Sequence, residues 1–363
     1  KMNVNVSHRL EGIGEYYFSS KLREIDELNK AGKGIINLGI GSPDLPPHPD
    51  VIKVLQDESS KDNVHAYQSY KGSPILREAI ANWYKKYFKV ADLNPATEIL
   101  PLLGSKEGIM HICMTYLNEG DQVLIPNPGY PTYTSAVKLA GGTPLYYELT
   151  AENNWAPDFE NLEKTDLSKV KLMWVNYPHM PTGQMPTKAL FEKLVAFGKQ
   201  HQILICHDNP YAFTLNDQPE SLLSIEGAKE VAIELNSLSK TFNMAGWRVG
   251  MLVGNYEYIS AVLRVKSNMD SGMFYGIQKG AIAALKSDTS WFESMNAIYS
   301  KRRVLTEQLA EKLGCEVYKE GVGLFVWAKL PAGISSAEQF IDQILYEKHI
   351  FITPGTIFGS NGE

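Results

Sequence analysis

The stretch Ser237-Leu-Ser-Lys-Thr-Phe-Asn-Met-Ala-Gly-Trp-Arg248 is the most informative segment of this sequence, because it places a lysine between hydroxyl residues and an arginine shortly after it. The amine of Lys240 can condense with an aldehyde to form an imine. Ser237, Ser239 and Arg248 can bind a phosphate, the arginine through a bidentate pair of hydrogen bonds. Pyridoxal 5'-phosphate (PLP) carries both an aldehyde and a phosphate, so the segment predicts a site for that cofactor. Alone, Lys240 would be a solvated surface side chain.

The whole string, including Gly246-Trp247-Arg248, resembles the lysine segment of class I and II aminotransferases, which are fold-type I PLP enzymes. Further motifs follow the family's order from Gly41 to Gly359. The resemblance implies an aminotransferase that moves the amino group between an α-amino acid and a 2-oxo acid in two half-reactions. Lys240 would hold the cofactor as a Schiff base and then carry a proton as general base and acid.

The length and composition describe an ordinary large enzyme. With 363 residues the chain exceeds the size at which one hydrophobic core stops growing, so we expect two domains that share a cofactor cleft. A net charge of −6 and the lack of a basic run argue against nucleic acid as a partner. No apolar run reaches the ~20 residues that span a bilayer and no signal-peptide pattern is seen, so we expect no membrane contact and a cytoplasmic location. The scattered cysteines, Cys113, Cys206 and Cys315, predict free thiols and no metal site.

Short apolar runs alternate with helical patterns through the middle of the chain. After a helical pattern over residues 76–88, buried strands are expected at Gln122–Ile125, Thr143–Leu149, Lys171–Asn176, Ile203–Asp208, Ala232–Ser237 and Val249–Gly254. Helices are expected near Thr132–Ala140, Thr187–Gln200 and Tyr256–Lys266. This alternation predicts an α/β fold, with a large PLP-binding domain whose mostly parallel sheet is sandwiched by helices.

The C-terminal part of the sequence predicts a smaller α+β domain. Its expected elements are a long helix over Asp288–Leu313, strands at Glu316–Lys319 and Leu324–Ala328, and a helix over Ala337–Lys348. We expect an N-terminal arm, residues 1–45, to pack with this small domain, residues 291–363, and the large domain to span residues 46–290. No flexible linker marks the boundary, so it is expected inside a continuous helix near residue 290.

Asp208 and Tyr211 are candidates for the catalytic machinery. Asp208 ends a predicted strand, and open α/β sheets bind ligands at the carboxyl ends of their strands. Alone, an aspartate there would be a cap or turn residue, but its distance from Lys240 resembles the family's spacing. The resemblance implies that the Asp208 carboxylate keeps the pyridine nitrogen protonated and that Tyr211 donates to the ring's 3'-oxygen.

Two further segments are candidates for holding the cofactor. Gly104, Ser105 and Lys106 open a predicted helix over Glu107–Leu117, so backbone N–H groups there can face an anion. A Gly-Ser pair before a helix is a weak signal alone, and the resemblance makes it the phosphate cradle. The resemblance also implies that Tyr130 stacks on the cofactor ring, with ordinary packing as the alternative.

The segment Asn176-Tyr-Pro-His-Met-Pro-Thr-Gly183 departs from the family pattern. The family has an asparagine before Pro-Thr-Gly, and its amide donates to the 3'-oxygen. This chain has Met180, whose thioether cannot donate. Either Tyr211 serves that oxygen alone, or Asn176 and a water compensate, so the departure bears on the electronic tuning of the cofactor.

The resemblance also implies a homodimer with shared active sites. Tyr67 lies in the segment whose tyrosine reaches the phosphate of the other subunit in family dimers, and Tyr70 is the competing candidate. On the substrate side, Gly41 matches a loop where glycine lets the backbone approach the substrate carboxylate. Ile40 beside it would wall the pocket.

The substrate side is otherwise weakly determined. The given sequence stops at Glu363, before the arginine that anchors the substrate carboxylate in the family, so we expect that arginine in a further C-terminal tail. The aromatic residues Tyr16, Tyr17 and Phe18 of the arm could close over the substrate or pack onto the body of the protein.

Two other functions compete with amino transfer. A β-elimination lyase uses the same fold and the same lysine chemistry. A PLP-sensing regulatory domain would need a helix-turn-helix unit and a basic face, and the sequence shows neither. The partners expected are therefore a small amino acid and a 2-oxo acid, with aspartate, aromatic amino acids and diaminopimelate as open possibilities.

Overall fold

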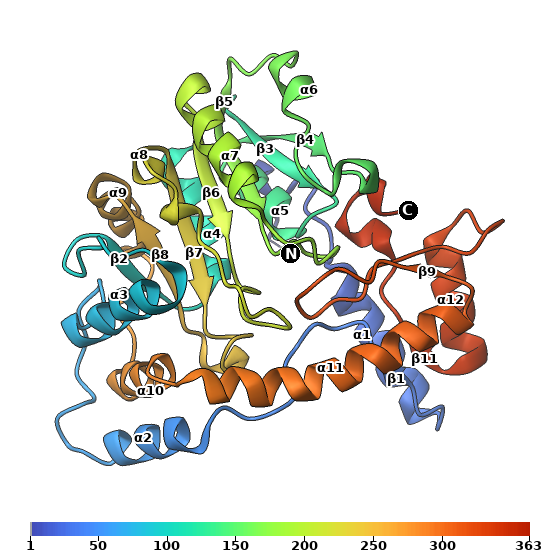
Figure 1. The fold of residues 1–363 in the computed structure, drawn as a ribbon, viewed down its shortest axis with the longest axis horizontal. Coiled ribbons are helices and arrows are strands. Elements are labelled where there is room, and N and C mark those ends of the chain that lie inside the picture. Colours follow the sequence, from blue (N-terminus) through green and yellow to red (C-terminus); the bar gives the residue numbers. More distant parts are fainter. Residues whose placement is uncertain (1) are drawn as a thin grey trace.

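A seven-stranded sheet forms the centre of the computed structural model, which describes residues 2–363 (Figure 1). The strand order is β2-β8-β7-β6-β5-β3-β4, in which β8 runs antiparallel to both β2 and β7 and the other neighbouring pairs are parallel. The strands are β2 (Ile99–Leu102), β3 (Gln122–Asn127), β4 (Thr143–Glu148), β5 (Val170–Asn176), β6 (Leu204–Asp208), β7 (Ala232–Ser237) and β8 (Gly250–Gly254). All six predicted strands of the sheet are present, and β2 adds a seventh.

Helices cover both faces of the sheet, as the alternating pattern predicted (Figure 1). One face packs on α3 (Pro74–Phe88) and α7 (Lys188–His201), and the same apolar cluster continues into α10 (Tyr275–Leu285) and α2 (Pro49–Ser59), which packs on α10. The other face packs on α4 (Ser105–Tyr116), α5 (Thr132–Leu139) and α9 (Tyr256–Lys266). Every residue of β7 and β8 is buried, which explains the continuous apolar run of β8, whereas β7 also buries three polar residues, Glu234, Asn236 and Ser237. The α/β fold with a mostly parallel sheet is thereby confirmed.

Segments from the two ends of the chain meet beside this sheet (Figure 1). Helix α1 (Tyr17–Lys30) packs on α12 (Ala337–Lys348), and β1 (Ile36–Asn37) pairs in parallel with β11 (Ile350–Phe351). Lys21 of α1 also forms a 2.9 Å ion pair with Asp342 of α12. The N-terminal arm and the C-terminal part therefore build one smaller α+β unit.

The long helix α11 (Thr289–Lys312) leads into this unit, and Asp288 caps its start. The expected domain boundary near residue 290 falls in its first turn. The division into residues 1–45, 46–290 and 291–363 stays a prediction. The remaining short elements are α6 (Phe159–Glu163), α8 (Ala228–Val231), β9 (Glu316–Val317) and β10 (Ala328–Lys329).

The predicted strand Leu324–Ala328 is wrong, because only its last residue enters a strand, β10. The backbone N–H groups of Val322 and Gly323 donate instead to the carbonyls of Gly183 and Thr214. The start of this segment is thus held against the loops that follow β5 and β6. The predicted strand Glu316–Lys319 is likewise shorter, since β9 ends at Val317.

Helices whose length and apolar character would allow them to cross a membrane are absent from residues 2–363.

Candidate active site

Lys240 lies in the turn that follows β7, at the carboxyl ends of the parallel strands. Its Nζ donates a 2.8 Å hydrogen bond to the carbonyl of Gly41. Burial, aided by the positive charge of Arg248, lowers the pKa of Lys240 to about 8. An amine with a lowered pKa is more often neutral near pH 7, which a nucleophile and proton carrier requires. The structure thus brings together Lys240 and Gly41, two residues that the sequence assigned to one site.

Arg248 and the start of α4 converge beside this lysine. Gly104 has φ +93° and precedes α4, and a Cβ atom there would lie 2.8 Å from Cζ of Arg248 and closer still to Nη2. Nη1 of Arg248 donates to the carbonyl of Ala245 at 2.6 Å, which orients the guanidinium. A guanidinium beside a helix N-terminus attracts an anion twice, through its own charge and through the free N–H groups of the first turn.

The two predicted phosphate-binding serines lie next to this group. Ser237 ends β7 and is the register partner of Gly250, and a Cβ atom at Gly250 would lie 2.8 Å from the backbone nitrogen of Ser105. The Oγ atom of Ser237 accepts a 3.0 Å hydrogen bond from the N–H of Ser239, and both serines are buried. Lys106 is exposed, and its ammonium lies 5.3 Å from the ring centroid of Tyr16.

Asp208 lies at the end of β6 with one of its two carboxylate oxygens paired. The hydroxyl of Tyr133 donates to Oδ2 at 2.7 Å, whereas the buried Oδ1 has no partner among residues 2–363. Burial raises the pKa of Asp208 to about 6, and the bond from Tyr133 acts in the opposite direction. A buried carboxylate oxygen without a donor is costly, and a protonated ring nitrogen is the donor that this position would accept.

Tyr130 and Tyr133 form an aromatic group on one side of Asp208. Their rings meet edge to face at 5.6 Å, and Tyr133 stacks on Trp174 at 5.1 Å. Burial raises the pKa of Tyr130 to about 12, so it is a neutral phenol at physiological pH. The sequence predicts a site role for Tyr130 but gives no sign of Tyr133, because the fold and not the chain order brings Tyr133 to Asp208.

Tyr211 lies against the residue at which this chain departs from the family pattern. Its hydroxyl donates to the sulfur of Met180 at 3.4 Å, and burial raises its pKa. The amide nitrogen of Asn176 donates to the backbone carbonyl of Asp208 at 2.8 Å, and its oxygen accepts from the backbone N–H of Met180 at 2.7 Å. Asn176 therefore connects the turn at Met180 to the end of β6, and the Tyr211 hydroxyl contacts the thioether of Met180.

Phe325 was not anticipated by sequence and connects two predicted site residues. Its ring meets Tyr211 edge to face at 5.5 Å, and a Cβ atom at Gly41 would lie 2.9 Å from its Cζ atom. It lies in the segment that was expected to be a strand, so no sequence pattern pointed to a role in the site.

The remaining predicted residues lie toward solvent in the single chain. Tyr67 is 90% exposed and Tyr70 is 48% exposed, and the side chain of Ile40 is exposed as well. Of the aromatic residues in the arm, Tyr17 and Phe18 pack in the apolar cluster of α1 and α12. That packing was one of the two alternatives for the arm, while the neighbouring Tyr16 lies beside Lys106.

The residues present fit PLP. Lys240 would hold its aldehyde, Arg248 and the start of α4 its phosphate, and the free oxygen of Asp208 its ring nitrogen. When bound, the cofactor supplies a ring that accepts electrons from a substrate carbon.

This fold and this set of residues define a fold-type I PLP enzyme. The model of the family described as "Aminotransferase class I and II" matches residues 33–363, and the chain belongs to that family. The LL-diaminopimelate aminotransferase of Aquifex aeolicus is 40% identical over 359 residues, which cover 98% of this chain and 92% of the relative. Transaminase BacF of Bacillus subtilis is 41% identical over 364 residues, covering 100% and 91%.

Solved structures agree with these relatives. The substrate-bound structure of BacF from Bacillus subtilis superimposes with a TM-score of 0.94 at 40% identity, covering 99% of this chain and 92% of that one. An aminotransferase from Staphylococcus aureus gives a TM-score of 0.89 at 31% identity, covering 98% and 92%. The protein is therefore a PLP-dependent aminotransferase.

We expect Gly104→Ala to weaken PLP binding by about tenfold or more, because the new methyl group displaces the Arg248 guanidinium. Titration of the apoprotein with PLP measures the effect. Gly120→Ala is a matched control, since Gly120 has φ +90° and open space where its Cβ would lie. Equal losses in the two variants would mean that backbone strain, and not the guanidinium, causes the change.

We expect Met180→Asn to lower the pH midpoint at which bound PLP changes its visible absorbance, by about one pH unit. The new amide adds an N–H donor beside the Tyr211 hydroxyl, and a donor there stabilises an anionic oxygen on the cofactor. A spectrophotometric pH titration of both proteins tests this. Met180→Leu, which adds no donor, serves as the control, and an unchanged or higher midpoint in Met180→Asn contradicts the assignment.

Proposed function

We propose that Lys240 is the catalytic lysine of this aminotransferase, forming the Schiff base with the cofactor and moving the proton between the substrate α-carbon and the cofactor. The observation that carries this assignment is the position of its Nζ atom. It is 2.8 Å from the Gly41 carbonyl, beside Arg248, with a pKa lowered to about 8. A lysine near its pKa can both accept and return a proton at neutral pH.

The roles of the other site residues follow from their partners. Asp208 would keep the ring nitrogen protonated through its unpaired Oδ1. Tyr211, whose hydroxyl donates to the sulfur of Met180 in the structure, would donate to the ring oxygen instead once the cofactor is bound. The guanidinium of Arg248 and the backbone N–H groups that follow Gly104 would bind the phosphate. Tyr130 covers one face of the ring, and Gly41 and Ile40 border the substrate.

The substrate is proposed from the relatives. Several of them, including those of Aquifex aeolicus and Dehalococcoides mccartyi, are LL-diaminopimelate aminotransferases, so LL-diaminopimelate is one candidate amino donor. Transaminase BacF is similar to the same degree, so other amino acids have equal standing. Incubating the PLP form with single amino acids and following its absorbance identifies the donor. Release of ammonia and pyruvate in place of pyridoxamine phosphate would identify the β-elimination alternative.

We expect Lys240→Ala to lose amino transfer by several orders of magnitude, because the imine-forming amine and the proton carrier are both removed. Single-turnover kinetics with the donor found in the screen measures the loss. Lys53→Ala on the surface of α2 is the control, since its side chain is 73% exposed. Near-normal turnover in purified Lys240→Ala would end the assignment.

We propose further that two copies of the chain form a homodimer in which Tyr67 reaches the phosphate site of its partner. The support is the 90% exposure of Tyr67 in the single chain together with the family resemblance of its segment. A tyrosine on a segment that packs into its own chain would bury most of its ring. The cytoplasmic location stays a prediction.

If the sites are shared, chains carrying Tyr67→Phe and Lys240→Ala will complement each other. A mixed dimer then holds one site with both changes and one with neither. Random pairing makes about half of the dimers mixed, so activity should return to about a quarter of the normal value. Tyr70→Phe in place of Tyr67→Phe tests the competing tyrosine. A fully active monomer at nanomolar concentration would contradict the shared site.

A further inference from the structure

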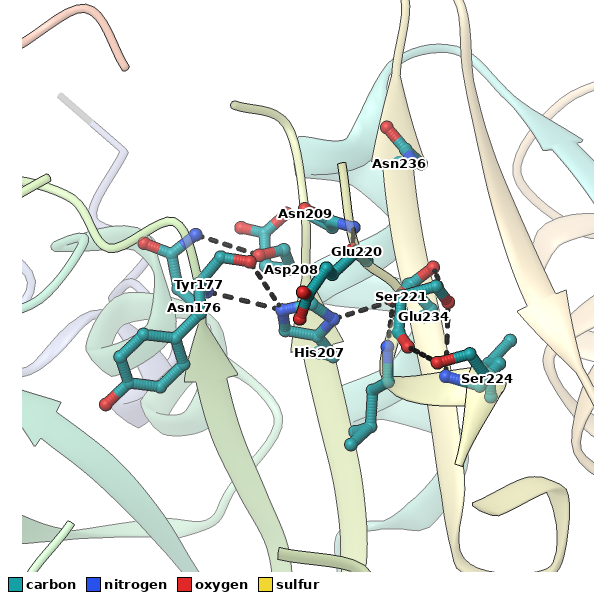
Figure 2. A network of polar contacts seen from close by, with 12 residues as sticks. Asn176, Tyr177, His207, Asp208, Asn209, Glu220, Ser221, Ser224, Glu234 and Asn236 are labelled. Atoms are coloured by element: carbon teal, nitrogen blue, oxygen red, sulfur yellow. Dashed lines mark hydrogen bonds and ion pairs between the residues drawn. The ribbon is translucent and has the colours of Figure 1, made fainter. Parts of the chain in front are cut away.

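A buried polar network lies on the face of the sheet opposite to the carboxylate of Asp208. Figure 2 shows it, with His207 between Tyr177 and Glu234. Side chains of His207 and Glu234 have no exposed surface, and neither residue belongs to the cofactor site described above. Burying such groups costs free energy unless they are fully hydrogen-bonded.

Glu234 on β7 accepts hydrogen bonds at both carboxylate oxygens. Oε2 accepts from the hydroxyls of Tyr84 at 2.7 Å and Ser221 at 2.8 Å. Oε1 is 2.7 Å from Nδ1 of His207 and accepts from the backbone N–H of Leu222 at 3.2 Å. These four contacts come from α3, β6 and the turn around Ser221, so the carboxylate joins three parts of the chain.

His207 on β6 carries this connection to the next strand. Its Nε2 lies 2.9 Å from the backbone oxygen of Tyr177, the residue that directly follows β5. In the sheet, His207 is the register partner of Glu234 on β7 and of Val175 on β5. One imidazole therefore links three neighbouring parallel strands, β5, β6 and β7.

Asp208 is the next residue after His207 and points to the other face. Its register partners are Asn176 and Leu235, and Tyr133 from α5 meets it there. Its backbone oxygen accepts from Asn176, and the following N–H, of Asn209, donates to the carbonyl of Leu235 at 2.9 Å. A shift of His207 would thus move the Asp208 carboxylate through the peptide that they share.

We propose that Glu234 and His207 are positioning residues, which fix the strand ends so that Oδ1 of Asp208 stands where the pyridine nitrogen of the cofactor binds. The pair acts through Asp208 and touches neither substrate nor cofactor. An apolar pair of similar volume would fill the same core space at lower cost, so the polar network contributes geometry that packing alone would not supply. This inference rests on the role proposed for Asp208.

The test compares two ligands that differ only at the ring nitrogen. These are PLP and its analogue with carbon in place of that nitrogen (deaza-PLP). Apoprotein is titrated with each, and the ratio of the two affinities reports the contact to Asp208, because a general loss of folding or of phosphate binding weakens both ligands alike. Glu234→Gln keeps the shape of the side chain and sets an NH2 group against groups that already donate.

We expect Glu234→Gln to lower the preference for PLP over deaza-PLP by about tenfold, the effect of losing one good hydrogen bond. Glu163→Gln is the matched control, because Glu163 also pairs with a histidine, His201 at 2.9 Å, on the protein surface. Should Glu234→Gln fail to fold, His207→Gln carries the same comparison and the same expectation.

The Asp208→Asn variant tests the contact of Asp208 with the ring nitrogen separately from the positioning role of Glu234 and His207. If Asp208→Asn lowers the affinity ratio while Glu234→Gln and His207→Gln leave it unchanged, the positioning role is overturned and the role of Asp208 stands. If Asp208→Asn itself leaves the ratio unchanged, the proposed contact to the ring nitrogen fails, and the inference fails with it.

Discussion

The half-paired carboxylate of Asp208 is the constraint around which this site is arranged. A carboxylate inside a protein requires donors, and here Tyr133 supplies one while Oδ1 has none within residues 2–363. Burial accordingly raises its pKa to about 6. The sheet holds the group in this position because its parallel strands end together and their neighbours tie down the backbone on both sides of it. Such a site is complete only when a cationic donor meets the free oxygen.

Positive charge is concentrated at the other side of the same site. Burial, together with the nearby positive charge of Arg248, lowers the pKa of Lys240. A bound phosphate would offset the Arg248 charge, so cofactor binding and the proton affinity of Lys240 are linked. This arrangement requires glycine at position 104, since a side chain there would occupy the space that the Arg248 guanidinium fills.

Much of this could be predicted from the sequence, and the parts that could not share a physical cause. Strand β8 is buried along its whole length and is apolar apart from its two glycines, so its composition reveals it. The segment Leu324–Ala328 has the same apolar character, but its neighbours Val322 and Gly323 bond to distant loops, which no local pattern encodes. Tyr133 and Phe325 were missed for the same reason, because tertiary contacts alone bring them to Asp208 and Tyr211. Met180 was visible as a departure, but its contact with Tyr211 was not.

The hydrogen bond from Lys240 to the Gly41 carbonyl links chemistry to motion of the chain. Gly41 lies four residues after β1, which pairs with β11. Its carbonyl therefore belongs to the segment, residues 38–48, that leads from β1 to α2. When another group binds the Lys240 amine, the Gly41 carbonyl loses this hydrogen-bond donor. By thermodynamic reciprocity, a shift of the segment that holds Gly41 changes how readily the Lys240 amine leaves this hydrogen bond. The engagement of the Lys240 amine and the position of the Gly41 segment are therefore coupled.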